Sequence, residues 1–147
     1  MGKENLEKNK WTYYSPTFEF TKDLPLISSA WSGHYFFVYD LIRNTQPHVV
    51  VELGTHKGNS LFSMAQAIKD GKLKTELHAV DTWKGDPQTG YYGEEVYEEF
   101  LRISKEYYKD IQIIPHKMLF DDTVKIFEEN SIDILHIDGL HTYEAVK

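Results

Sequence analysis

From residue 48 onward, segments whose apolar residues follow a strand-like pattern alternate with segments whose apolar residues recur at helical spacing. Short apolar runs that are rich in β-branched residues predict strands, and apolar residues at helical spacing predict the helices between them. The expected strands are 49–53, 76–80, 111–114 and 132–137. The expected helices are 60–69, 94–109 and 122–129, with another from Tyr143. This order predicts an α/β fold with a Rossmann-like, doubly wound parallel sheet.

The first thirty residues follow no such pattern. Residues 1–10 are charged, and Pro16 and Pro25 interrupt residues 11–30. Residues 31–43 then predict a largely buried helix. We therefore expect an N-terminal tail and irregular segment over residues 1–30, followed by one folded domain over residues 31–147.

Three expected strands each end in an acidic residue: Glu52, Asp81 and Asp138. In a parallel sheet the carboxyl ends of the strands share one edge, and ligands bind along that edge. A carboxylate there repels phosphate and suits a ligand with positive charge or free hydroxyls. Together the three acids predict a binding site for such a ligand.

The first of these strands leads into a turn that reads E-L-G-T-H-K-G-N-S. Gly54 and Gly58 bracket the turn, and Asn59 and Ser60 are good residues to cap the helix that follows. A dinucleotide-binding turn would read G-x-G-x-x-G and would lie closer to the acid of the next strand. His56 stands where a second close-approach glycine would be, which disfavours a pyrophosphate cradle.

Composition narrows the class of protein. The 147 residues suit a single domain, and a net charge of −7 disfavours nucleic acid as a partner. The chain has no cysteine, and this fits a reducing compartment. No stretch approaches the ~20 apolar residues of a membrane span, and the charged N-terminus is no signal peptide. We expect a cytoplasmic protein that acts on a small molecule, away from membranes.

Three segments resemble one family. E-L-G-T-H-K-G-N-S is similar to motif I, E-x-G-x-G-x-G, of class I S-adenosylmethionine-dependent methyltransferases. A-V-D-T-W-K-G-D-P-Q-T-G-Y-Y-G and S-I-D-I-L-H-I-D-G-L-H-T-Y-E-A-V-K resemble its bacterial methyltransferase-24-type branch, which is often associated with glycosyltransferases. The departures are His56 at the middle glycine and the end of the chain at Lys147. The family has seven strands in the order 3-2-1-4-5-7-6, so the resemblance implies that this chain supplies the half 3-2-1-4 and is incomplete at its C-terminus.

The resemblance also implies how S-adenosylmethionine would be held. Glu52 would hold the positive methionine end, directly or indirectly, while Gly54 and Gly58 would let the backbone approach the cofactor. Asp81 would accept hydrogen bonds from the ribose hydroxyls. The remaining expected contacts are Thr55, His56, Asn59 and Ser60 around the cofactor, with Thr82 and Trp83 flanking the adenine.

The segment D-G-L-H-T-Y carries the expected catalytic residues, Asp138 and His141. In related sugar O-methyltransferases an acid at the Asp138 position binds Mg²⁺ and a histidine at the His141 position acts as the base. A divalent ion could bind substrate hydroxyls and lower the pKa of one of them. The implied reaction is O-methylation of a sugar or another small hydroxylated acceptor.

Two other functions stay open at this point: a non-catalytic cofactor-binding fragment, and a nicotinamide-dependent oxidoreductase.

We also expect the apolar fourth strand to form an exposed edge, through which the chain could form a homo-oligomer. The other histidines show no partner pattern and are interpreted as structural or surface residues: His34, His48, His78, His116 and His136.

Overall fold

The structure is a computed structural model, and it describes residues 10–25 and 31–139. Four parallel strands form the main sheet in the order β5-β2-β1-β6. Their bounds are β1 Val49–Leu53, β2 Glu76–Asp81, β5 Gln112–Lys117 and β6 Ile134–Ile137. When the four strands are numbered by their order along the chain, their order in the sheet is 3-2-1-4. The predicted α/β class and strand order are therefore confirmed.

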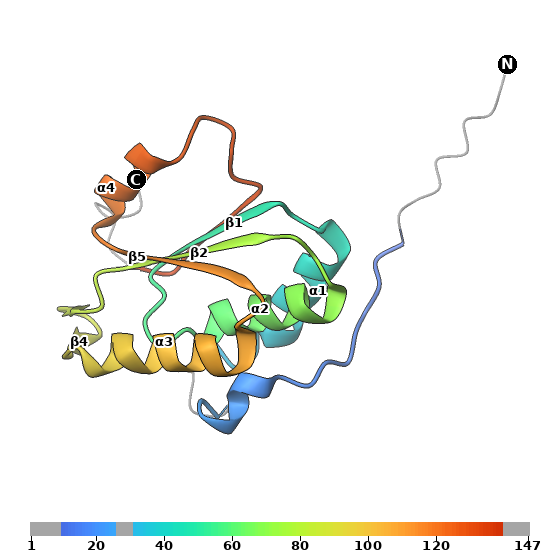
Figure 1. The fold of residues 1–147 in the computed structure, drawn as a ribbon, viewed down its shortest axis with the longest axis horizontal. Coiled ribbons are helices and arrows are strands. Elements are labelled where there is room, and N and C mark those ends of the chain that lie inside the picture. Colours follow the sequence, from blue (N-terminus) through green and yellow to red (C-terminus); the bar gives the residue numbers. More distant parts are fainter. Residues whose placement is uncertain (1–9, 26–30, 140–147) are drawn as a thin grey trace, which may run out of the picture.

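Three helices lie on one side of the sheet and the short helix α4 lies on the other (Figure 1). The three are α1 Tyr35–Thr45, α2 Asn59–Gly71 and α3 Glu95–Tyr108; α4 spans Phe120–Thr123 and continues into the 3-10 turn η3, Val124–Ile126. Every residue of α2 from Ser60 to Ile68 is buried. Since α2 is buried in this way, the position of its N-terminus is fixed by packing as well as by the turn before it.

The N-terminal segment packs into the same core. Its 3-10 helix η1, Glu19–Lys22, brings Phe20 into the core, and Phe18 and Leu24 are buried on either side. The Asp23 carboxylate then accepts hydrogen bonds from Arg102 (3.0 Å) and from the Tyr107 hydroxyl (2.7 Å) on α3. Residues 10–25 are therefore attached to the helices, and they lead the chain to the edge of the sheet where the strands end.

Several predicted boundaries were wrong for identifiable reasons. Strand β5 continues through Pro115, which was expected to end it, because β5 is at the edge of the sheet and an edge strand tolerates a missing N–H donor. The helix expected over residues 122–129 ends early, because Phe127 is extended and packs its ring against His78 and His116. β6 begins at Ile134, two residues later than predicted.

Helix α1 is less buried than its composition predicted. It begins at Tyr35 and buries Tyr35, Val38, Tyr39 and Ile42, but Phe36 and Phe37 are exposed. The reason is geometric, since only one stripe of a helix can face its neighbours. None of the helices in the described ranges is long and apolar enough to cross a bilayer.

Candidate functional site

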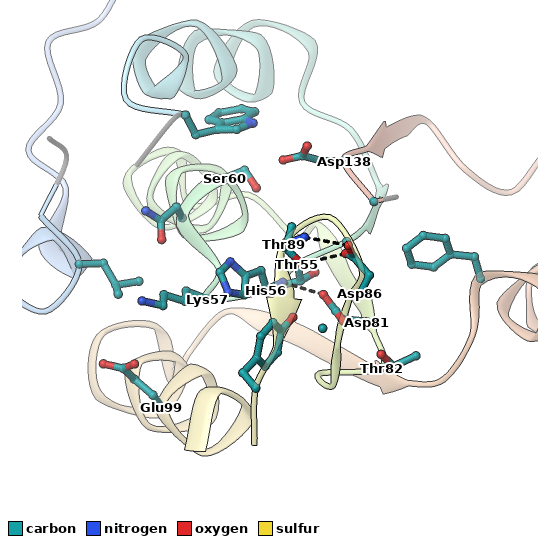
Figure 2. A pocket seen from close by; sticks show the side chains of 18 of the residues that line it. Thr55, His56, Lys57, Ser60, Asp81, Thr82, Asp86, Thr89, Glu99 and Asp138 are labelled. Atoms are coloured by element: carbon teal, nitrogen blue, oxygen red, sulfur yellow. Dashed lines mark hydrogen bonds between the residues drawn. The ribbon is translucent and has the colours of Figure 1, made fainter. Parts of the chain in front are cut away.

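A pocket of about 920 Å³ opens at the carboxyl ends of β1, β2 and β6 (Figure 2). The turn between β1 and α2 forms its centre. The described residues that line it are Asp23, Leu24, Pro25, Trp31, Gly54, Thr55, His56, Lys57, Asn59, Ser60, Asp81, Thr82, Gly85, Asp86, Thr89, Tyr92, Glu99, Leu119, Phe120, Asp121, Asp138 and Gly139. Three parts of the chain that are far apart in sequence therefore meet at the edge that the sequence predicted.

The β1–α2 turn has a left-handed backbone at Gly54 (φ 95°), His56 (φ 50°) and Gly58 (φ 94°). Residues with a Cβ rarely adopt such angles, and this explains the glycine that the family motif places at the His56 position. The turn is tied to the sheet by the Gly54 N–H, which donates to the Val80 carbonyl at 2.8 Å. His56 therefore keeps the turn geometry while placing an imidazole ring against the pocket.

The two glycines also serve the protein's own packing, and Gly54 lines the pocket. A Cβ on Gly54 would lie 2.2 Å from the Asp138 carbonyl oxygen. A Cβ on Gly58 would lie 2.6 Å from the ring of Phe62, and Gly58 does not line the pocket. Gly58 is also the residue that caps α2, so the prediction that Asn59 or Ser60 caps the helix was wrong.

Asp81 ends β2 and holds two loops together. Its Oδ2 accepts the N–H of His56 at 2.8 Å and its Oδ1 accepts the N–H of Trp83 at 2.8 Å. Each carboxylate oxygen has two lone pairs, so each can accept one further hydrogen bond. The side chain is thus fixed in place and still able to accept from a pair of ligand hydroxyls.

Trp83 lies behind the pocket and does not line it. Its side chain is buried, and its indole Nε1–H donates to the His56 carbonyl at 2.8 Å. From this position the ring supports the β1–α2 turn from within the core, so the position argues against the expected contact with adenine. Thr82 does line the pocket, beside Asp81.

Glu52, at the end of β1, is fully buried one layer behind the lining. Its Oε1 accepts a short hydrogen bond from the hydroxyl of Ser60, which lines the pocket. The same oxygen lies 2.9 Å from Nδ1 of His136 on β6, whereas Oε2 has no hydrogen-bond partner among the described residues. His136, which was interpreted as a structural or surface residue, therefore has a structural role beside a buried carboxylate that the sequence pattern did not reveal.

The first helical residue, Asn59, points its side-chain amide to the core side. Its Nδ2 donates to the hydroxyl of Tyr35 at 2.9 Å. This bond joins the start of α2 to the start of α1 beside the pocket. Asn59 lines the pocket with one of the two N–H groups of its amide donated to Tyr35.

Sequence reasoning missed a small hairpin that forms one wall. Strands β3, Gly85–Asp86, and β4, Gly90–Tyr91, lie within the stretch expected to be a loop, and they place Asp86, Thr89 and Tyr92 at the pocket. Two-residue strands carry no periodic signal, so only the abundance of Gly and Tyr in the stretch could have suggested the hairpin. The ring of Tyr92 lies 5.0 Å from the imidazole of His56, between centroids.

The pocket is predominantly acidic. Its acidic lining residues are Asp23, Asp81, Asp86, Glu99, Asp121 and Asp138, and Lys57 is the one lysine or arginine among the described lining residues. Burial, with the charge of Lys57, lowers the pKa of His56 despite the opposing charges of nearby carboxylates, so the imidazole is neutral near pH 7. Burial, with the charges of Asp81 and Asp86, raises the pKa of Tyr92 to about 12. The pocket therefore suits a ligand with positive charge and hydroxyl groups.

Asp138 lines the pocket at the end of β6, where the sequence placed it. His141, the other expected catalytic residue, lies outside the described residues. Residues 10–25 and 31–139 contain no group of three or more His, Cys, Asp or Glu side chains that could hold a metal ion. The expected role of Asp138 as a metal ligand therefore stays a prediction.

A family model for a methyltransferase domain matches residues 51–147, a range that contains the turn, Asp81 and Asp138. The chain belongs to this methyltransferase-24 family. A curated relative is the uncharacterized protein y4gI of Sinorhizobium fredii, which is 40% identical over 119 residues. The match covers 81% of the methyltransferase chain but 13% of that relative, so the chain spans a small part of the relative's length.

A solved structure shares the methyltransferase fold. The methyltransferase PaMTH1 of Podospora anserina, whose crystal structure contains S-adenosylhomocysteine (SAH), matches with a TM-score of 0.59 and 16% sequence identity. The match covers 82% of this chain and 46% of PaMTH1. The class I methyltransferase fold implied by the sequence resemblance is thereby confirmed.

Proposed function

We propose that this chain is the cofactor-binding part of an S-adenosylmethionine-dependent O-methyltransferase that acts on a sugar or another small hydroxylated molecule. One observation carries the proposal: the β1–α2 turn, Asp81 and Asp138 line one acidic pocket in a chain of the methyltransferase family. S-adenosylmethionine carries an ammonium, a sulfonium and a ribose diol, and it has no phosphate. These positive charges and hydroxyl groups match the acidic side chains that line the pocket.

The residues present fit this cofactor. Asp81 would accept from the ribose hydroxyls with the lone pairs that the backbone leaves open. Ser60 would accept from the ammonium, because its own proton is donated to Glu52. The buried Oε2 of Glu52, with no partner among the described residues, supplies a negative charge behind that contact.

When bound, S-adenosylmethionine supplies a methyl group already activated by its sulfonium. The chain's own task is then to align an acceptor oxygen with that methyl group and to remove the proton of the acceptor. Asp138 stands at the strand end where an acceptor would approach. His141 remains the predicted base, and the binding of Mg²⁺ by Asp138 also remains a prediction.

Binding of S-adenosylhomocysteine, measured by isothermal titration calorimetry, tests the proposal. We expect binding to the wild-type chain and a loss of at least about tenfold, or about 1.4 kcal/mol, in Asp81→Asn, because an amide offers one acceptor oxygen where the carboxylate offers two. Asp110→Asn, an exposed change of the same type, should bind as the wild type does.

A chain that releases no heat with S-adenosylhomocysteine but is stabilised against heat by NAD would contradict the proposal in favour of an oxidoreductase. Cofactor binding without methyl transfer would instead favour a non-catalytic module. Circular dichroism of each variant should accompany the titrations, since Asp81 also supports the turn.

A further inference from the structure

His136 is the feature that the proposed function leaves unused. It lies on β6 directly beside Glu52 of β1 in the parallel register, so the two side chains leave the same face of the sheet. Its Nδ1 lies 2.9 Å from Oε1 of Glu52. Because a carboxylate only accepts, Nδ1 carries the hydrogen and donates it.

The other contacts of His136 fix the orientation of its ring. The indole of Trp31 lies 5.2 Å from the imidazole between centroids, at 75° between the planes, which is an edge-to-face arrangement. Trp31 itself lines the pocket. The imidazole is thus held between an aromatic ring and a buried carboxylate, and turning Nδ1 away from Glu52 would break their hydrogen bond.

Glu52 is then held at the same oxygen from two sides. Ser60, at the start of α2, donates to Oε1 from the helix side, and His136 donates from the strand side. A buried carboxylate is costly unless donors satisfy it. His136 is one of its two donors among the described residues, and the second donor is the hydroxyl that reaches the pocket.

We propose that His136 is a positioning residue for the amino-acid end of the cofactor. Through Glu52 it sets the direction of the Ser60 hydroxyl, so that the lone pairs of Ser60 face the ligand's ammonium. The inference rests on the proposed function, and it extends that function by assigning the ammonium subsite to the line of residues from His136 through Glu52 to Ser60.

Two ligands separate this subsite from the rest of the pocket. S-adenosylhomocysteine carries the ammonium, whereas 5′-methylthioadenosine keeps the nucleoside and the sulfur but lacks the amino-acid end. A residue that acts only on the ammonium subsite changes the affinity for the first ligand and leaves the second unchanged. A residue that merely supports the fold changes both.

The experiment compares His136→Met with His136→Asn by isothermal titration of both ligands into the full chain. Met fills a similar volume without a donor, while the Asn amide can donate from the position of Nδ1. We expect His136→Met to weaken S-adenosylhomocysteine by about tenfold and to change methylthioadenosine by less than about twofold. His136→Asn should restore most of the affinity for S-adenosylhomocysteine.

Equal weakening of both ligands in His136→Met, or no weakening of either, would overturn the assignment, as would an Asn variant as weak as the Met variant. If His136→Met does not fold, Ser60→Ala tests the same subsite, since it must also weaken S-adenosylhomocysteine alone. A wild-type chain that binds neither ligand would refute the proposed function itself, which is a different outcome from these.

Discussion

His56 shows how one residue can depart from a family motif and keep its geometry. Its backbone is left-handed, and it is held by the Asp81 carboxylate at the N–H and by the Trp83 indole at the carbonyl. These two bonds fix the peptide groups on both sides of the residue. The family's glycine is therefore a conformational preference that the surrounding contacts replace here.

Replacing His56 with Ala and with Gly should separate the backbone from the ring. Both changes remove the contact with Tyr92, but only Ala keeps a Cβ in the left-handed region, at a cost of about 1–2 kcal/mol. The greater chain entropy of Gly in the unfolded state offsets part of this difference. We therefore expect the free energy of unfolding in urea to be about 1 kcal/mol higher for His56→Gly than for His56→Ala.

The same pair of changes at Lys109 is the control, because Lys109 has an ordinary helical backbone (φ −56°). There Ala should equal or exceed Gly in stability. An Ala variant as stable as the Gly variant at position 56 would mean that the left-handed turn relaxes when the ring is removed.

The sequence predicted the secondary elements well because each long strand and helix carries its own periodic pattern. What it could not give was the contacts between elements. His136 and Glu52 are 84 positions apart, and only the order β1 beside β6 brings them together. The β3–β4 hairpin escaped prediction because its strands are too short to show a period, and Trp83 was misplaced because a loop position does not reveal which way a side chain faces.

The pairing of β2 with β5 should make stability depend on pH. His78 Nδ1 lies 2.8 Å from His116 Nε2, with the rings stacked and the Glu76 carboxylate 3.4 Å from His78 on its other side. Burial, with the charge of His78, lowers the pKa of His116 below its ordinary value of 6.5. The unfolded chain then binds the proton first, so this contribution to stability is complete above about pH 6.5 and is lost as the pH falls toward the folded pKa.

The free energy of unfolding should fall when the pH is lowered from 7.5 to 5.5. We expect this fall to be smaller in His116→Asn than in the wild type. His136 acts in the opposite direction: burial lowers its pKa, but Glu52 and Asp138 outweigh this and raise it, so its contribution is lost as the pH rises. Gln112→Asn, an exposed change on the same strand that involves no titratable group, is the control and should keep the wild-type slope. A His116→Asn slope equal to that of the wild type would contradict the coupling.

At the scale of the whole molecule, the two sides of the sheet are unequal. Among the described residues, α1, α2 and α3 cover one side (Figure 1). Leu135 and Ile137 alternate with His136 along β6 and so face the other side, where they are 49% and 47% exposed. Val124 and Ile126 of η3 are exposed as well. Exposed apolar residues on an edge strand favour association with another chain.

The chain should therefore associate with itself as its concentration rises. Leu135→Lys should weaken this association, since a charged residue on an edge strand opposes pairing. Sedimentation velocity across a range of concentrations measures the effect. Tyr13→Lys, at a residue that is 83% exposed in the N-terminal segment, is the control and should associate as the wild type does. If the chain remains a monomer at all concentrations, the exposed apolar residues of β6 do not mediate self-association.

The double use of Asp81 limits how the pocket can be redesigned. A designer who wishes to admit a modified nucleoside would first alter Asp81, the acid that we propose accepts from the ribose, yet this carboxylate also holds the peptide groups of His56 and Trp83. Changing it would move two loops together with the ligand. Thr82 is the better starting point, because it lines the same wall and the hydrogen bond that its hydroxyl accepts among the described residues is a long one, 3.4 Å from the Lys84 nitrogen. Selectivity toward new cofactors is therefore more accessible beside the acid than at it.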